Sequence, residues 1–127
     1  MSQKRRVLVV DDEKLIRDLI TNLLTKNNFE VICAEDGAEA LELFEEVYPD
    51  IVVTDFKMPR MDGISFLAAL WEKHPSFPVI FMSGHFNLSE ELGVLAEGCT
   101  RFYPKPLDPE ELLSAINELI NNSTYNQ

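Results

Sequence analysis

The sequence predicts a single α/β domain built on a doubly wound sheet of five parallel strands. Short apolar runs alternate five times with amphipathic stretches, and several of these runs are apolar throughout. Strands that are buried on both faces have this continuous apolar character, which is typical of parallel sheets. The 127 residues also match the size of one ordinary domain, so we expect one core and no second unit.

Five segments are the strand candidates. The first, third and fourth are continuous β-branched and apolar runs, and the fifth is the weakest. In chain order they are residues 7–10, 30–34, 51–54, 78–82 and 101–103. Pro104 follows the fifth segment and removes a backbone N–H, which an edge strand tolerates.

Between the strand candidates, apolar residues recur at helical spacing. We interpret these five stripes as the core faces of five helices, the fourth of them weakened by Gly93. The stripes are Leu15, Ile16, Leu19, Ile20, Leu23 and Leu24; Ala38, Leu41, Phe44 and Val47; Ile64, Phe66, Leu67, Leu70 and Trp71; Leu88, Leu92, Leu95 and Ala96; and Leu112, Leu113, Ile116, Leu119 and Ile120.

The composition is strongly acidic, with a formal net charge of -11. Such a surface repels nucleic acids and anionic membranes, and it favours divalent cations and basic partner surfaces. No apolar run approaches the roughly 20 residues that span a bilayer, and no signal peptide is recognisable, so we expect a cytoplasmic protein. Cys33 and Cys99 lie outside any metal-binding motif and beside apolar segments, so we expect buried thiols.

Polar side chains follow four of the strand candidates, at the sheet edge where doubly wound proteins bind ligands. They are Asp11, Asp12 and Glu13 after the first strand, Asp55 after the third, Ser83 after the fourth and Lys105 after the fifth. Each has an ordinary alternative, such as a helix cap at Asp12 or a turn former at Asp55. Their convergence at one edge favours a functional site.

These residue types suit phosphoryl transfer. Clustered carboxylates repel one another unless a cation relieves them, and Mg²⁺ prefers oxygen ligands. An aspartate beside Mg²⁺ can attack phosphorus as a nucleophile. The Lys105 ammonium and the Ser83 hydroxyl could then neutralise or bind the phosphoryl oxygens.

The chain resembles the response-regulator receiver domain of two-component signalling, in its stand-alone form. The resemblance rests on residues 7–13, on Asp55 with residues 58–63, on 82–84 and on 105–106. It covers residues 5–121 and leaves 122–127 as a polar tail. It implies a flavodoxin-like fold with strand order 2-1-3-4-5, in a signalling switch that is not an enzyme.

The resemblance also implies a role for each site residue. Asp55 would accept a phosphoryl group from a histidine kinase or a histidine phosphotransfer protein. Asp12, Asp55 and the backbone carbonyl of Lys57 would bind Mg²⁺, with Asp11 acting largely through water. Lys105 would pair with a phosphoryl oxygen, and Ser83 would bond the phosphate through its hydroxyl. Phe102 would be an aromatic switch. A downstream protein would bind the face formed by the fourth helix, fifth strand and fifth helix, and the chain would be a monomer or weak dimer.

Several alternatives stay open. Lys57 either weakens Mg²⁺ binding or contacts the phosphoryl group, and His85 either tunes dephosphorylation or is a surface residue. A phosphohydrolase of the haloacid-dehalogenase type would carry a second aspartate where Lys57 stands. A receiver-like scaffold would act by protein contacts alone, without phosphorylation.

Overall fold

A parallel sheet of five strands lies at the centre of the protein. The computed structural model describes residues 4–56, 61, 63–83, 100–104 and 108–122. The strands are β1 (Arg6–Val10), β2 (Glu30–Ala34), β3 (Ile51–Asp55), β4 (Val79–Ser83) and β5 (Thr100–Pro104), and the helices are α1 (Lys14–Lys26), α2 (Gly37–Val47), α3 (Gly63–Lys73) and α5 (Pro109–Asn122). The strand order is β2-β1-β3-β4-β5, which confirms the predicted fold and topology.

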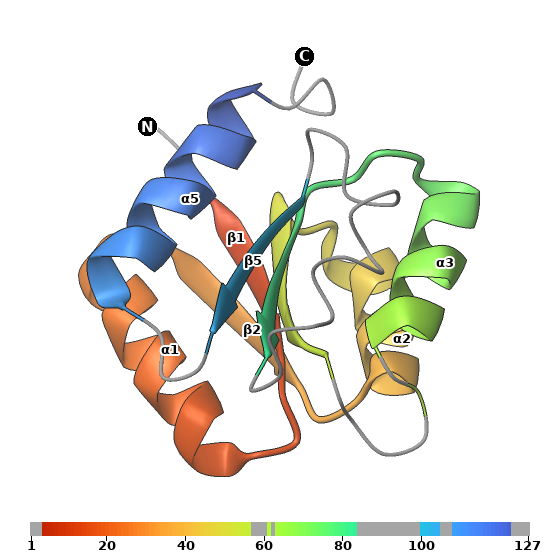
Figure 1. Ribbon diagram of the computed structural model, residues 1–127, viewed down its shortest axis with the longest axis horizontal. Helices are drawn as coiled ribbons and strands as arrows, with labels where there is room; N and C mark the ends of the chain where they lie inside the picture. The colour runs from red at the N-terminus through yellow and green to blue at the C-terminus, as the bar shows by residue number, and fades with distance from the viewer. Residues whose placement is uncertain (1–3, 57–60, 62, 84–99, 105–107, 123–127) are drawn as a thin grey trace.

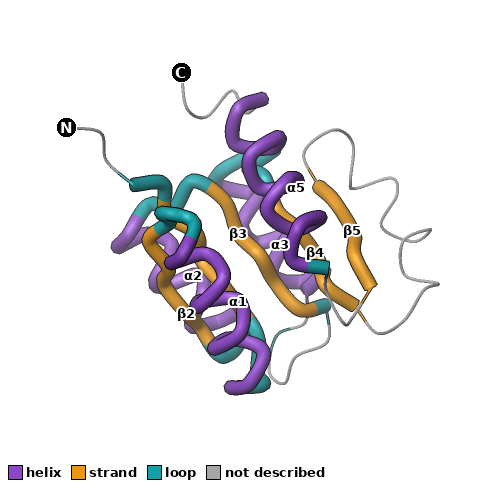
Figure 2. Tube along the Cα trace, turned by 90° about the vertical axis from the view of Figure 1, so that its left-hand side faces the viewer, coloured by secondary structure: helices purple, strands orange, loops and turns teal. Residues whose placement is uncertain are grey.

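The helices cover both faces of the sheet. Helices α1 and α5 pack on one face, and α2 and α3 pack on the other (Figure 1). Strands β2 and β5 lie at opposite edges (Figure 2). Pro104 therefore ends an edge strand, where its missing N–H is tolerated.

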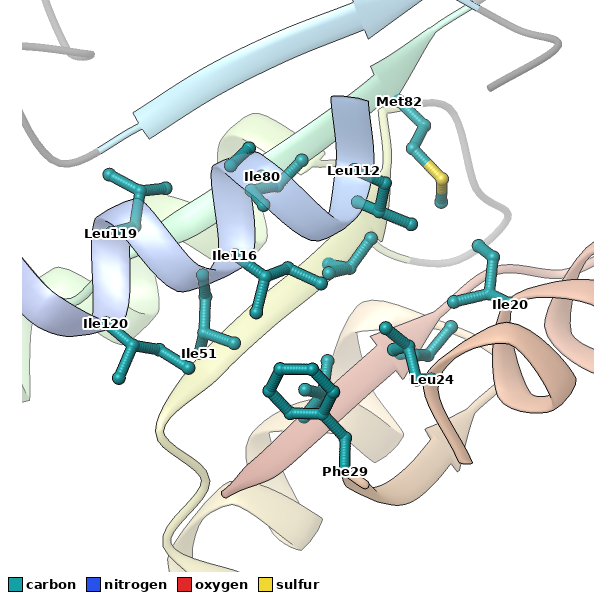
Figure 3. Close-up of a cluster of buried hydrophobic side chains, with 14 residues drawn as sticks. Ile20, Leu24, Phe29, Ile51, Ile80, Met82, Leu112, Ile116, Leu119 and Ile120 are labelled. Carbon is teal, nitrogen blue, oxygen red and sulfur yellow. The ribbon is translucent and has the colours of Figure 1, made fainter. Parts of the chain in front are cut away.

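The core has two apolar layers because side chains alternate along each strand. Val7 and Val9 point toward α1 and α5, whereas Leu8 and Val10 point toward α2 and α3. Figure 3 shows side chains of α1 and α5 gathered over the strands in the first of these layers. The central strands β1 and β3 are thereby buried on both sides, which explains their continuous apolar sequences.

Three expectations about burial are wrong. In α2, Ala38 is exposed, because the helix turns Ala40 and Phe44 toward the core instead. In α1, Ile20 and Leu24 are buried, but Leu15 and Leu19 are 69% and 57% exposed. The six-residue stripe is wider than the part of a helix that one sheet face can cover. Cys33 is exposed because it lies on the edge strand β2.

Some predictions fall outside the described residues. Among them are the fourth helical stripe, Cys99 and His85. Helix α5 extends to Asn122, one residue into the stretch expected as a tail.

Candidate functional site

The carboxyl ends of β1 and β3 bring four carboxylates together. Val10 pairs with Thr54 in the sheet, so the residues that follow them, Asp11 and Asp55, end side by side. One carboxylate oxygen from each of Asp11, Asp12, Glu13 and Asp55 lies within 4.8 Å of the others. Asp11 is fully buried and Asp55 is 7% exposed, whereas the other two are exposed. We call these four residues the acidic cluster.

The turn between β1 and α1 is held by hydrogen bonds around Asp11. Its backbone N–H donates to the Ala34 carbonyl at 3.1 Å. Its carboxylate Oδ1 accepts the Glu13 N–H at 2.8 Å, and its carbonyl accepts Arg17 Nη1 at 2.7 Å. The N-cap of α1 is Glu13, so the alternative that Asp12 caps this helix is wrong.

Gly63, the first residue of α3, packs closely against Phe81 and against Phe56, which directly follows Asp55. The Gly63 N–H donates to the Phe56 carbonyl at 2.7 Å, and the Phe56 N–H donates to the Met82 carbonyl at 3.0 Å. A Cβ atom on Gly63 would lie 2.9 Å from Phe81 Cε1 and 3.1 Å from Phe56 Cα. Glycine is therefore favoured here, because it lets α3 begin against Phe56, the residue next to Asp55.

The electrostatics of the acidic cluster favour a bound cation. Two of its carboxylates are buried beside two exposed ones, and like charges at this separation repel. A hard divalent cation with oxygen ligands relieves that repulsion, and Mg²⁺ commonly uses one or two carboxylates with waters and phosphate oxygens. The donor set of this site consists of carboxylate oxygens, so the residues present fit Mg²⁺.

The other predicted site residues are placed in part. The backbone of Ser83 ends β4 one residue beyond Met82, which pairs with Asp55. The backbone of Phe102 pairs with Phe81. The side chains of Ser83 and Phe102, and all of Lys57 and Lys105, lie outside the described residues.

Sequence reasoning missed Arg17, which the structure places against the backbone of the acidic cluster. No motif marks this residue. Its position four residues after Glu13, in the first turns of α1, is a weak signal that it could reach back to the preceding turn.

The comparison with protein families decides what this arrangement is. The family model for the response regulator receiver domain matches residues 7–117. The chain belongs to the response regulator receiver domain family. This membership places it with the signalling switches of two-component systems, and not with the phosphohydrolases considered as an alternative.

The receiver has relatives that match most of its length. It is 37% identical over 117 residues to the chemotaxis protein CheY of Bacillus subtilis, covering 91% of this chain and 98% of that protein. It is 35% identical over 119 residues to the response regulator MprA of Mycolicibacterium vanbaalenii. That match covers 94% of this chain and 52% of the relative, so the receiver spans about half the length of MprA.

Solved structures show the same fold. A response regulator receiver domain protein from Clostridium thermocellum superposes with a TM-score of 0.86 at 33% identity, covering 97% of this chain and 99% of that one. CheY4 of Vibrio cholerae gives a TM-score of 0.82 at 28% identity, covering 92% and 99%. Within the described part of the receiver, no helix is long and apolar enough to cross a membrane.

Proposed function

We propose that the receiver is a phosphorylation switch and that Asp55 is its phosphoacceptor. The observation that carries this proposal is the juxtaposition of Asp55 with Asp11, Asp12 and Glu13. Asp55 ends the central strand β3 beside the exposed Asp12 and Glu13, at the sheet edge where doubly wound proteins bind ligands. Family membership supports a phosphoacceptor role for the domain.

The chemistry is a transfer of one phosphoryl group. An Asp55 oxygen attacks the phosphorus of a donor phosphohistidine, the P–N bond breaks, and the imidazole leaves with the electron pair and gains a proton from water. Hydrolysis reverses the modification: water attacks the phosphorus, the acyl-phosphate P–O bond breaks, and inorganic phosphate leaves. Because little covalent help is needed, the protein contributes mainly position and charge.

We assign the cation site to Asp12 and Asp55 as direct ligands, with the Lys57 carbonyl as a further ligand. Mg²⁺, when bound, neutralises charge on the phosphoryl oxygens. Asp11 already accepts the Glu13 N–H through Oδ1, which supports a role for Asp11 through water instead of direct binding. The positive end of the α1 dipole, which begins at Glu13, also favours anionic groups here.

The remaining roles concern the response to phosphorylation. Lys105 pairs with a phosphoryl oxygen, Ser83 donates its hydroxyl to another, and Phe102 turns inward behind Ser83. Contacts made only in the phosphorylated state shift the population between two similar conformations. The output face in this proposal comprises β5, α5 and the fourth helix expected from the sequence. Strand β5 and helix α5 are joined by an ion pair between Arg101 and Glu118 at 2.9 Å.

The phosphodonor is a histidine kinase or a histidine phosphotransfer protein. A protein donor has to cover the acidic cluster, and the adjoining α1 exposes Leu15 and Leu19, which suit burial against a partner. The exposed thiol of Cys33 fits a reducing compartment such as the cytoplasm. We take residues 5–121 as the switching unit and 122–127 as its tail, acting as a monomer or weak dimer.

Intact mass spectrometry tests the proposal. The receiver is incubated with acetyl phosphate in Mg²⁺ or in EDTA, beside an Asp55→Asn variant. We expect the wild type to gain one phosphoryl group only in Mg²⁺, and the variant to gain none. If the wild type stays unmodified and also fails to bind beryllofluoride, the receiver acts as a phosphorylation-independent scaffold.

A further inference from the structure

Arg17 connects helix α1 to the turn that carries Asp11, Asp12 and Glu13 and to the loop before α2. Its Nη1 donates to the Asp11 carbonyl at 2.7 Å, and its Nη2 lies 3.6 Å from Glu35 Oε1. The side chain is only 14% exposed. A guanidinium withdrawn from water to this extent needs such partners, because an uncompensated buried charge is costly.

The contact with Asp11 fixes the part of the chain that carries the clustered charges. The backbone N–H and carboxylate of Asp11 are held by Ala34 and Glu13, and Arg17 holds its carbonyl. The peptide linking Asp11 to Asp12 is therefore restrained on both sides. Repulsion among the carboxylates would otherwise favour a wider turn.

The contact with Glu35 anchors Arg17 to the loop before α2. The Glu35 N–H donates to Glu39 Oε1 at 2.7 Å, and the Glu39 N–H donates to Asp36 Oδ1 at 2.9 Å. Glu35 is thus tied to the first turn of α2. The guanidinium adds a side-chain link between this loop and the Asp11 turn, which the hydrogen bond from the Asp11 N–H to the Ala34 carbonyl already joins.

We propose that Arg17 is a positioning residue for the cation site, which rests on the Mg²⁺ site proposed above. Two effects of Arg17 on Mg²⁺ oppose each other. Its positive charge repels a cation, so charge alone predicts that removing Arg17 tightens Mg²⁺ binding. Its hold on the Asp11 backbone keeps the ligands in place, so positioning predicts that removing it weakens binding. Partners that orient metal ligands typically contribute about 10–100-fold in affinity.

The test measures the Mg²⁺ dissociation constant by isothermal titration calorimetry at constant ionic strength. The variants are Arg17→Gln and Arg17→Lys. The matched control is Arg6→Gln, because Arg6 makes the same kinds of contact at the opposite end of the sheet: Nη1 donates to the Val47 carbonyl at 2.7 Å, and Nε pairs with Glu30 at 3.2 Å. Circular dichroism in EDTA establishes that each variant is folded.

We expect Arg17→Gln to weaken Mg²⁺ binding by about tenfold, Arg17→Lys to weaken it less, and Arg6→Gln to leave it unchanged. If Arg17→Gln does not fold, a loss of affinity in Arg17→Lys carries the same meaning. Unchanged or tighter binding in the folded Arg17 variants would overturn the inference, as would an equal loss in Arg6→Gln. A wild type that binds no Mg²⁺ would instead overturn the proposed function itself.

Discussion

Replacing Asp55 with asparagine removes one negative charge from the acidic cluster and keeps nearly the same side-chain shape. In the absence of a cation, Asp55 lies beside three other carboxylates, one of which is fully buried. The substitution should therefore raise the free energy of unfolding in EDTA. In Mg²⁺ the same substitution removes a ligand of the cation. The difference in the free energy of unfolding between the variant and the wild type should then shrink or reverse.

The size of the effect follows from the separations. At 4.8 Å, the upper limit for these separations, two ionised carboxylates repel by about 3.5 kcal/mol with an effective dielectric constant of about 20, and by about 0.9 kcal/mol in bulk water. The first value suits the buried Asp11 and the second suits the exposed Asp12 and Glu13. Counterions, relaxation and hydrogen bonds lost by the asparagine reduce the total. We expect a net stabilisation of about 1–3 kcal/mol in EDTA, because these opposing terms are themselves of that order.

Urea unfolding in EDTA and in Mg²⁺ measures this difference. Trp71 reports global unfolding, because its indole N–H donates to the Phe77 carbonyl at 3.0 Å within the α3 side of the core. The control is Glu42→Gln, which changes the net charge equally at an exposed position on α2. Saturating Mg²⁺ should stabilise the wild type by about 2.7 kcal/mol at 100 times its dissociation constant.

Two results would refute this reasoning. One is an Asp55→Asn variant that is no more stable than Glu42→Gln in EDTA. The other is that adding Mg²⁺ raises the free energy of unfolding of Asp55→Asn and of the wild type by the same amount. Either would mean that the clustered carboxylates do not repel or that Asp55 does not contribute to cation binding.

Three further predictions concern stability. Gly63→Ala should lower the free energy of unfolding by about 1–3 kcal/mol in urea titrations, because its Cβ would lie 2.9 Å from a buried Phe81 atom. Tyr48→Gly should raise the melting temperature, since Tyr48 is exposed and has a φ of 48°, which costs an L-residue about 1–2 kcal/mol; a fall would mean that the tyrosine ring makes stabilising contacts. Burial, reinforced by Glu111 and Glu118 and opposed by Arg101, raises the pKa of Tyr103 above 10.0. Folding therefore favours the protonated hydroxyl, so the wild type should lose more stability than Tyr103→Phe as the pH rises above 10.0. Plots of the free energy of unfolding against pH that stay parallel for the two proteins would contradict this.

The sheet and the acidic cluster could be predicted from the sequence because both follow from short-range patterns. Strands β1 and β3 are buried on both faces, so their sequences are apolar without alternation. In a parallel sheet, whatever follows each strand meets at one edge. Asp11 and Asp55 lie close together because β1 and β3 are neighbours, and that adjacency was predicted from the strand order that the resemblance to receiver domains implies.

Contacts between distant segments could not be predicted in this way. The exposure of Leu15 and Leu19 depends on how α1 is rotated against its neighbours, which an apolar stripe wider than the buried face leaves undetermined. The contacts of Arg17 depend on the rotamer of a long side chain and on the path of two loops. The preference for glycine at residue 63 arises from Phe81, which belongs to a different strand.

The most direct test of the central claim is to locate the phosphoryl group. The receiver is treated with acetyl phosphate and Mg²⁺, reduced with borohydride, which converts an aspartyl phosphate to homoserine, and digested for peptide mass spectrometry. We expect homoserine at residue 55 alone, and none when EDTA replaces Mg²⁺. Homoserine at Asp11 or Asp12 with residue 55 unmodified, or an unmodified protein, would contradict the assignment of Asp55 as the phosphoacceptor.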